Sequence, residues 1–554
     1  MLRRYYYKNP GLAANDLTAR ITRPGCEVSE RGSGESSFTY YDTQSGRVYR
    51  GGFRLRFRGG EGGWSLEEEV GRGGWVEKAE GPAMDASGAE ASRTGPAAPA
   101  PPGEGPVGRK LRRVLGGRRL VPVLEAGVRE ERRAVSSPGM GEALLTFQTW
   151  RFTRPYNGGP SATASLILVE SVSSPEARGG GKRGARRAGL SGSTAGESAS
   201  FSILLRDLFG GVKPSDGPLV LGLEALGLPI PGAPVPERCS VAGEDTFPAA
   251  ILKVLGAQAH KMRANREGAI HDLDPGFLHD LRVAARRARL ALKHARRGLD
   301  RGRCEFLRGE LAWAAEQFGG VRDLDVFTAD MDEQLARVEA SPEAREAVMG
   351  ALAARRVRDC GALSETLRSA RFASLLSEID ALCIPERQGA EREGAEKEGG
   401  GITYASAAVQ EAARDLIGDA LGKVKKRGRG LGRGKKLRAG DVTPAELHSL
   451  RIAFKELRYT CEFFAPLFGG GMKEVIRSLV KFQDCLGRHQ DARVAAGILG
   501  GVIAGPLMPP DVLIVLGSLI QLHRERAIGE RRALLALWPV FASVAEELRT
   551  QIDR

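Results

Sequence analysis

The sequence predicts an α+β protein of two parts, an antiparallel β domain followed by an all-helical domain. The stretch FRLRFR at 53–58 alternates apolar and basic side chains with a period of two, which is typical of a strand with one buried face. Two later stretches, which begin at His279 and His448, share one helical pattern of cations and apolar residues. Such a repeat indicates two similar helical units related by duplication.

The predicted β domain occupies residues 1–230. One face of its clearest strand carries three cations that are candidates for contacts with phosphate, Arg54, Arg56 and Arg58. The next stretch, WSLEEEV, alternates as well, so we expect an antiparallel hairpin with its turn at 59–63. Residues 79–108 are rich in Gly, Pro and Ala, and 171–200 in Gly, Ser and Arg, so both are expected to be mobile insertions.

The predicted helical domain occupies residues 246–554, after a linker at 231–245. A polar break divides it into halves of about 246–385 and 402–554. Near the start of the second half, the segment 423–438 holds nine Lys or Arg and no acid. This segment is expected to be either a solvated loop or a flexible arm that captures polyanions.

The first helical copy, HDLRVAARRARLALKHARR at 279–297, holds seven Lys or Arg and one acid. At about 100° per residue, the apolar positions fall on one side and predict a core-facing stripe. The opposite side carries a row at spacings of three and four: His279, Arg282, Arg286, Arg289 and Lys293. Like charges at these spacings repel by a few tenths of a kcal/mol per pair. The row is therefore either a solvated face or a surface that meets a polyanion.

The second copy, HSLRIAFKELRYTCEFF, begins 169 residues later and repeats the row as His448, Arg451, Lys455 and Arg458. Further downstream, FGGVRDLDVF from Phe318 is echoed by LGRHQDARVA from Leu486, so that Asp323 matches Asp491. Two such units packed around a pseudo-twofold axis would place the cationic rows opposite one another. The repeat therefore predicts a basic groove.

The repeated H-x-x-R motif and the G-x-x-R-D-L-D-V segment resemble the conserved-histidine α-helical domain, CHAD, over roughly 246–554. The resemblance implies a pair of four-helix bundles that binds inorganic polyphosphate. It carries over to the two rows, with Lys293 and Lys481 as additional contacts. We interpret Asp323 and Asp491 as structural residues that orient basic side chains, because a carboxylate cannot bind a polyanion without a metal.

The spacing of the cations also suits a linear polyanion. Helix positions i, i+3, i+7 and i+10 supply a row of charges at about 1.5 Å rise per residue. Base-stacking aromatics do not interleave with the row, although Tyr459 and Phe463 lie on its flank. Binders of single-stranded nucleic acid usually combine charge with such aromatics. Nucleic-acid binding therefore stays open as an alternative, without an expected sequence-specific target.

The run YYDTQSGRVYRGGFRLRFRGGEGGWSLEEE resembles the CYTH domain, the triphosphate tunnel fold of thiamine triphosphatases and class IV adenylate cyclases. The resemblance implies an antiparallel barrel, and in family enzymes an E-x-E-x-K strand holds a divalent metal. This chain begins MLRRYYYKNP, with no acid before Asp16. Glu67, Glu69 and Glu170 are the acids left to rebuild a metal site.

These departures favour a degenerate barrel that keeps a basic wall, with no catalytic residue and no metal ligand. Mg²⁺ or Mn²⁺ is expected only if the barrel is active. The alternative is a metal-dependent hydrolase of triphosphates or short polyphosphates, with the helical domain holding the substrate.

Composition supports a polyanion as the partner. The 554 residues carry a formal net charge of +14, which attracts polyanions. The seven cysteines are dispersed and include no C-x-x-C, as expected for reduced thiols in the cytoplasm. No secretion signal is visible, and prolines divide the apolar region 495–522 into pieces too short to span a membrane. We therefore expect a cytoplasmic protein, located at polyphosphate granules, with inorganic polyphosphate and no membrane among its partners.

Overall fold

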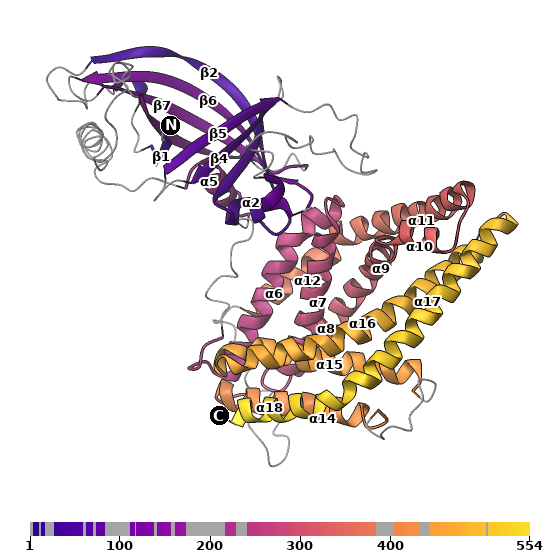
Figure 1. Ribbon diagram of the computed structural model, residues 1–554. Coiled ribbons are helices and arrows are strands. Elements are labelled where there is room, and N and C mark those ends of the chain that lie inside the picture. Colours follow the sequence, from indigo (N-terminus) through magenta and orange to yellow (C-terminus); the bar gives the residue numbers. More distant parts are fainter. Residues whose placement is uncertain are drawn as a thin grey trace, which may run out of the picture. The chain divides into compact units, whose positions relative to one another are not determined.

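The chain divides into two compact units, Met1–Pro234 and Val235–Arg554. Figure 1 shows strands in the first unit and helices in the second, as the sequence predicts. The computed structural model describes residues 4–9, 13–16, 27–58, 63–69, 74–82, 111–116, 118–137, 141–156, 161–172, 216–228, 241–383, 404–431, 442–505 and 508–553.

Antiparallel strands of the first unit close into a barrel in the order β1-β5-β4-β3-β2-β6-β7-β8. The predicted hairpin between β3 and β4 is present, with Phe57 opposite Trp64. The strands are β1 (Arg4–Lys8), β2 (Glu27–Asp42), β3 (Phe53–Arg58), β4 (Gly63–Glu69), β5 (Gly74–Pro82), β6 (Val121–Ser137), β7 (Gly141–Thr153) and β8 (Ala162–Val172). The short helices are η1 (Ala14–Asp16), α2 (Arg47–Arg50) and α5 (Pro218–Ala225).

The inside of the barrel is filled by this chain's own side chains. Phe38 on β2 and Trp150 on β7 belong to strands that are not neighbours, yet their ring centroids are 6.1 Å apart. Helix α5 packs its buried Leu219 and Leu223 into the same apolar cluster. A Cβ atom on Gly222 of α5 would lie 2.6 Å from side-chain atoms of this cluster, so only glycine allows this close approach.

The basic face of β3 differs from the prediction. Arg54 and Arg56 were expected on the exposed side of a half-buried strand, but they are 1% and 8% exposed and lie inside the barrel. Barrel closure covers this face, while the opposite face, with Phe53 and Leu55, packs on the helical turn at 111–115. Of the three arginines of β3, Arg58 alone is exposed.

Strands also extend into the two predicted insertions. β5 runs to Pro82 and β8 to Val172, so the first residues of 79–108 and 171–200 are strand rather than loop. The remainder of both insertions, most of the hairpin turn at 59–63, most of the 231–245 linker and the break at 386–401 lie outside the described residues.

The second unit is helical throughout its described residues. Its helices are α6 (Phe247–Ile270), α7 (Pro275–Ala295), α8 (Arg301–Gln317), α9 (Gly319–Thr328), α10 (Met331–Arg337), α11 (Pro342–Arg368), α12 (Ala370–Leu382), α14 (Val409–Arg427), α15 (Pro444–Phe464), α16 (Gly471–Ile503), α17 (Pro510–Leu537) and α18 (Phe541–Asp553). Two short 3₁₀ turns, η7 (Ala465–Leu467) and η8 (Trp538–Val540), join neighbouring helices.

The helices form the two predicted four-helix bundles. In the first, α6, α7, α8 and α12 contact one another in a ring, and in the second α14, α15, α16 and α18 do the same. Both bundles contribute to one apolar core, and α7 contacts α15 between them. The ends of α16 and α17 build a second core with α9, α10 and α11. The five cysteines among the described residues are free.

The two helices that carry the cationic rows begin in the same way. Asp274 caps α7 by accepting a hydrogen bond from the Gly276 amide at 2.6 Å, and Pro275 occupies the first turn. Thr443 caps α15 in a reciprocal capping box with Glu446, again followed by a proline. The apolar stripe predicted for the first copy is buried, apart from the half-buried Phe277. Local signals and burial therefore agree on where both helices lie.

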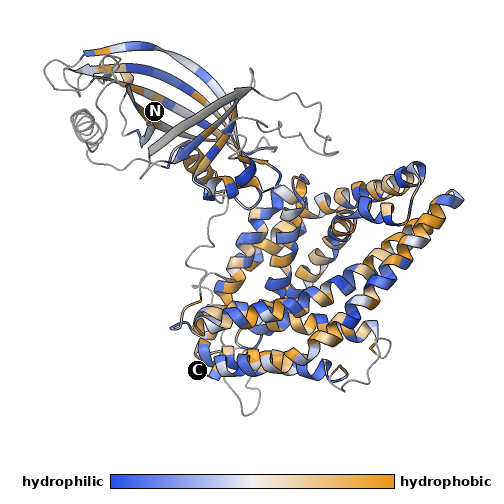
Figure 2. Cartoon of the chain, viewed as in Figure 1, coloured by the Kyte–Doolittle hydropathy of each residue, from blue (hydrophilic) through white to orange (hydrophobic). Residues whose placement is uncertain are grey.

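The apolar region 495–522 forms parts of α16 and α17, which meet at a proline-containing turn as predicted. Hydrophobic and hydrophilic residues alternate along these helices in Figure 2. None of the described helices is long and apolar enough to cross a membrane. The basic segment 423–438 is not a loop over its first residues, because α14 continues to Arg427, and 432–438 lies outside the described residues.

Candidate functional site

Four cations from the two repeated rows come together where the bundles meet: Arg282 and Arg286 on α7, and Arg451 and Lys455 on α15. We call these four residues the central cationic cluster. All four are half-buried. Each arginine is close enough to lower the pKa of Lys455. The pseudo-twofold repeat thus places the two rows against one another.

The charges of this cluster are poorly compensated. Burial, followed by repulsion from Arg286, Arg451 and Arg282, lowers the pKa of Lys455 to about 6. Within the described residues, the side chains of Arg286, Arg451 and Lys455 have no ion pair with a carboxylate. Cations without a carboxylate partner in a half-buried position leave room for an external anion.

The two repeated aspartates flank the cluster. Asp323 on α9 lies 3.6 Å from the Arg282 guanidinium, which also donates a hydrogen bond to the Phe318 carbonyl at 3.4 Å. Asp491 on α16 favours the charged forms of Arg451 and Lys455, while its own pKa is raised by burial. Asp323 therefore orients one cation, as the sequence suggested, without neutralising the cluster.

Each repeated histidine stands beside the residue that precedes its aspartate. Burial and the nearby Arg322 lower the pKa of His279. In the second copy, Nδ1 of His448 lies 3.4 Å from Oε1 of Gln490, which occupies the position matching Arg322. Arg322 is a cation that our sequence analysis missed, although it stands directly before Asp323 in the repeated segment.

The remaining predicted contacts lie around the cluster. Arg289 is near Arg308 of α8, a second cation that was not predicted. Arg458 lies 3.1 Å from the Glu462 carboxylate of its own helix. Lys481 is exposed on α16. The structure thus brings four of the ten predicted helical residues into one cluster, and Arg322 and Arg308 extend it at either side.

Lys293 is engaged by an acid. Its ammonium donates hydrogen bonds of 2.8 Å to both carboxylate oxygens of Glu456, and Lys423 of α14 donates to the same carboxylate at 2.7 Å. Burial raises the pKa of Glu456, but these two lysines outweigh it and lower the pKa to about 2. In this structure Lys293 therefore joins α7 to α15 and α14.

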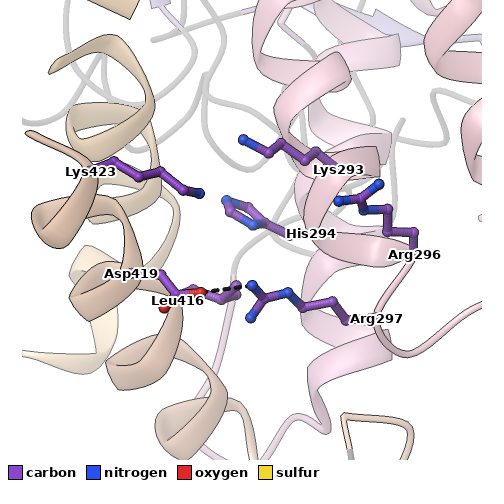
Figure 3. Close-up of a pocket in the computed structure, with 7 residues that line it drawn as sticks. All are labelled: Lys293, His294, Arg296, Arg297, Leu416, Asp419 and Lys423. Atoms are coloured by element: carbon purple, nitrogen blue, oxygen red, sulfur yellow. Dashed lines mark hydrogen bonds and ion pairs between the residues drawn. The ribbon is translucent and has the colours of Figure 1, made fainter. Parts of the chain in front are cut away.

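A small cavity of about 60 Å³ lies beside this pair, between α7 and α14 (Figure 3). Arg297 extends from the end of α7 and binds Asp419 at 2.7 Å. His294 is 4% exposed and shares a hydrogen bond of 3.1 Å with Thr460. Burial lowers the pKa of His294 to about 3, so its ring is neutral. Because carboxylates already pair its cations, the cavity differs from the central cationic cluster.

Inside the barrel, the expected metal site does not fit the residues present. Glu67 accepts a hydrogen bond from the Tyr6 hydroxyl at 3.2 Å and lies 3.4 Å from the Arg56 guanidinium. Nearby Arg54 is fully buried, which adds positive charge where a divalent cation would bind. Among the described residues, no group of three or more His, Cys, Asp or Glu could hold a metal. The side chain of Glu69 lies outside the described residues.

Comparison with known structures finds similar proteins for both regions. The CHAD domain from the plant Ricinus communis is 23% identical, with a TM-score of 0.43, and the match covers 54% of this chain and 94% of that chain. PptA from Streptomyces chartreusis is 20% identical, with a TM-score of 0.38, over 53% of this chain and 100% of that chain. A proposed adenylate cyclase from Bacillus halodurans, similar to the N-terminal region, is 13% identical, with a TM-score of 0.22, over 39% and 95%.

Comparison with curated proteins gives no match. Comparison with family models does give one, because residues 253–500 match the CHAD domain. The matched segment contains both cationic rows and the whole central cationic cluster. The chain therefore carries a CHAD domain at residues 253–500, as the repeated histidine and arginine motif predicts.

Proposed function

We propose that the helical unit binds inorganic polyphosphate across the central cationic cluster. The observation that carries this proposal is that Arg286, Arg451 and Lys455 have no carboxylate partner within the described residues. A chain with about one negative charge per phosphate would relieve their mutual repulsion. We further propose that the protein acts in polyphosphate metabolism, in the cytoplasm and at polyphosphate granules.

The arrangement supports binding of a linear chain. Arg282 and Arg286 lie one turn apart on α7, about 6 Å along the axis, and Arg451 and Lys455 repeat this spacing on α15. Arginine can make two parallel hydrogen bonds to phosphate oxygens, while lysine acts as a point charge. Beyond the cluster, the chain would pass toward Arg322 on one side and Arg308 on the other.

The surroundings of the row favour an anion without bases. Tyr459 and Phe463, the aromatic residues on its flank, are only 3% and 4% exposed. The Arg287 guanidinium stacks within about 5 Å of both rings, at 5.3 and 5.1 Å from their centroids. Neither ring is thus available to stack on a base, as proteins that bind single-stranded nucleic acid require.

For the barrel, we propose a binding role rather than hydrolysis. Glu67 is occupied by Arg56 and Tyr6, which disfavours a metal-binding role for this carboxylate. Arg58 remains exposed and is the arginine of β3 that can meet phosphate at the surface. Binding of this kind needs no cofactor, whereas the hydrolytic alternative requires Mg²⁺ or Mn²⁺.

The direct test is a competition titration of the full-length protein at physiological salt. Labelled long-chain polyphosphate is bound first, and then unlabelled polyphosphate, single-stranded DNA or double-stranded DNA is added at equal charge concentration. We expect polyphosphate to compete far more effectively than either nucleic acid. Salt dependence alone does not separate them, because every polyanion releases counterions on binding. Equal or better competition by nucleic acid would contradict the proposal.

A further inference from the structure

Lys455 is surrounded by cations from both bundles. Arg282 and Arg286 face it from α7, Arg451 faces it from its own helix, and Asp491 of α16 is the acid that acts on it. Within the described residues, its ammonium has no hydrogen bond or ion pair. The matching position in the first copy is Arg286, whose guanidinium stays charged in proteins. The two halves of the site therefore differ in one titratable group.

We propose that Lys455 makes the site selective for dense polyanions, because it is neutral in the free protein and takes up a proton from solvent when closely spaced phosphates cover the cluster. This inference rests on the proposed function and adds a mechanism of discrimination to it. The proton comes from water or buffer and is bound at Nζ. No other bond forms or breaks.

The electrostatics of the cluster support this mechanism. Burial and the three arginines lower the pKa of Lys455 to about 6, so its amine is mostly neutral at pH 7.5. Negative charge nearby raises the pKa of a lysine. A polymer with one charge on each closely spaced phosphate supplies more charge over the cluster than a nucleic-acid strand of equal length. The denser polymer therefore gains an additional charged contact that the sparser polymer gains less fully.

The coupling fixes the direction of the pH dependence. Lys455 binds more protons in the complex than in the free protein at every pH between the two pKa values. Affinity for polyphosphate should therefore fall as pH rises above about 6, by up to about tenfold per pH unit. A permanently charged residue at this position removes that contribution.

The test is calorimetric titration of the full-length protein with long-chain polyphosphate at pH 7.5, in two buffers of different ionisation enthalpy. The difference in heat gives the number of protons taken up. We compare the wild type with Lys455→Arg, and we use Lys481→Arg, an exposed lysine on α16, as the matched control. The wild type and the control should take up about one proton more per occupied site than Lys455→Arg.

A second readout uses the same proteins at pH 8. Lys455→Arg should bind single-stranded DNA more tightly than the wild type does, so its preference for polyphosphate should fall about tenfold. Equal proton uptake by wild type and Lys455→Arg, with both proteins binding, would overturn this inference and leave the proposed function standing. Failure of the wild type to bind polyphosphate at all would overturn both.

Discussion

Lys293 on α7 and Glu456 on α15 form an ion pair with both carboxylate oxygens 2.8 Å from the ammonium. A second pair, between Arg287 and Glu462, joins the same two helices. Glu456 follows Arg287 by 169 residues, and Glu462 follows Lys293 by the same offset. The two pairs therefore occupy repeat-equivalent positions with their charges exchanged. This exchange fixes α7 against α15 and aligns the central cationic cluster.

Loss of the Glu456 carboxylate should destabilise the helical unit. Glu456→Gln leaves Lys293 and Lys423 close together without their shared acid, while the Glu456 side chain is only 10% exposed. We expect the free energy of unfolding at pH 7 to fall by about 3 kcal/mol, measured by urea denaturation of the full-length protein. The control is Glu474→Gln, whose pair with Arg477 is exposed, and its effect should stay below about 0.5 kcal/mol.

The same pair should make stability depend on acid pH. The pKa of Glu456 is lowered from 4.5 to about 2, so its contribution is complete above pH 4.5 and is lost as pH falls toward 2. The difference in unfolding free energy between the wild type and Glu456→Gln should therefore shrink over this range and vanish near pH 2. A difference that stayed constant from pH 7 to pH 2 would show that the pair does not act through this ionisation.

Arg356 of α11 should support the site from behind. It donates hydrogen bonds to Asp272, in the turn before α7, at 2.7 Å and to the nearly buried Asp325 of α9 at 2.8 Å. It thereby holds together the elements that carry Arg282 and Asp323. Arg356→Lys cannot make both contacts in the same planar geometry, so we expect a loss of about 2 kcal/mol in unfolding free energy.

The same substitution should weaken polyphosphate binding several-fold, although it removes no charge from the central cationic cluster. The control is the adjacent Arg355→Lys, because Arg355 makes a looser contact of 3.8 Å with Asp359. Both variants are measured by urea denaturation and by polyphosphate titration. A variant at position 356 that binds like the control would separate this network from the site.

The barrel should release little phosphate. Because Glu67 is held by Arg56 and Tyr6, we expect phosphate release from tripolyphosphate, ATP or thiamine triphosphate to stay near background with Mg²⁺ or Mn²⁺. A malachite-green assay of the purified protein measures this release. Steady turnover that Glu67→Gln abolishes would instead establish the hydrolytic alternative.

The sequence predicted the elements of the site better than its pairings. The apolar stripe and proline-preceded caps of α7 and α15 are local signals, so the helices and their cationic rows could be placed correctly. The partner of Lys293 lies 163 residues away and becomes its neighbour through bundle packing alone. Arg322 escaped notice because its counterpart in the second copy is the uncharged Gln490.

The barrel shows a similar limit. Alternation in FRLRFR predicted the strand and its hairpin, because side chains of a strand point to opposite faces. Alternation does not reveal whether the polar face meets water or the inside of a closed barrel. Arg54 and Arg56 lie inside because strands far apart in the sequence complete the wall, as with β1 beside β8.

The most direct measurement of the central claim compares polyphosphate affinity of two double variants with that of the wild type. The variants are Arg282→Ala with Arg286→Ala, and Arg451→Ala with Lys455→Ala. The control, Arg337→Ala with Arg345→Ala, removes two cations that already lie near Glu333 and Asp332.

Each cluster variant should lose on the order of 1.5–3 kcal/mol of binding free energy per removed contact, while the control binds like the wild type. Helical content by circular dichroism should be retained, because the substitutions relieve repulsion on the helices. Cluster variants that stay folded and bind as tightly as the wild type would contradict the account, and so would variants that lose their helical content.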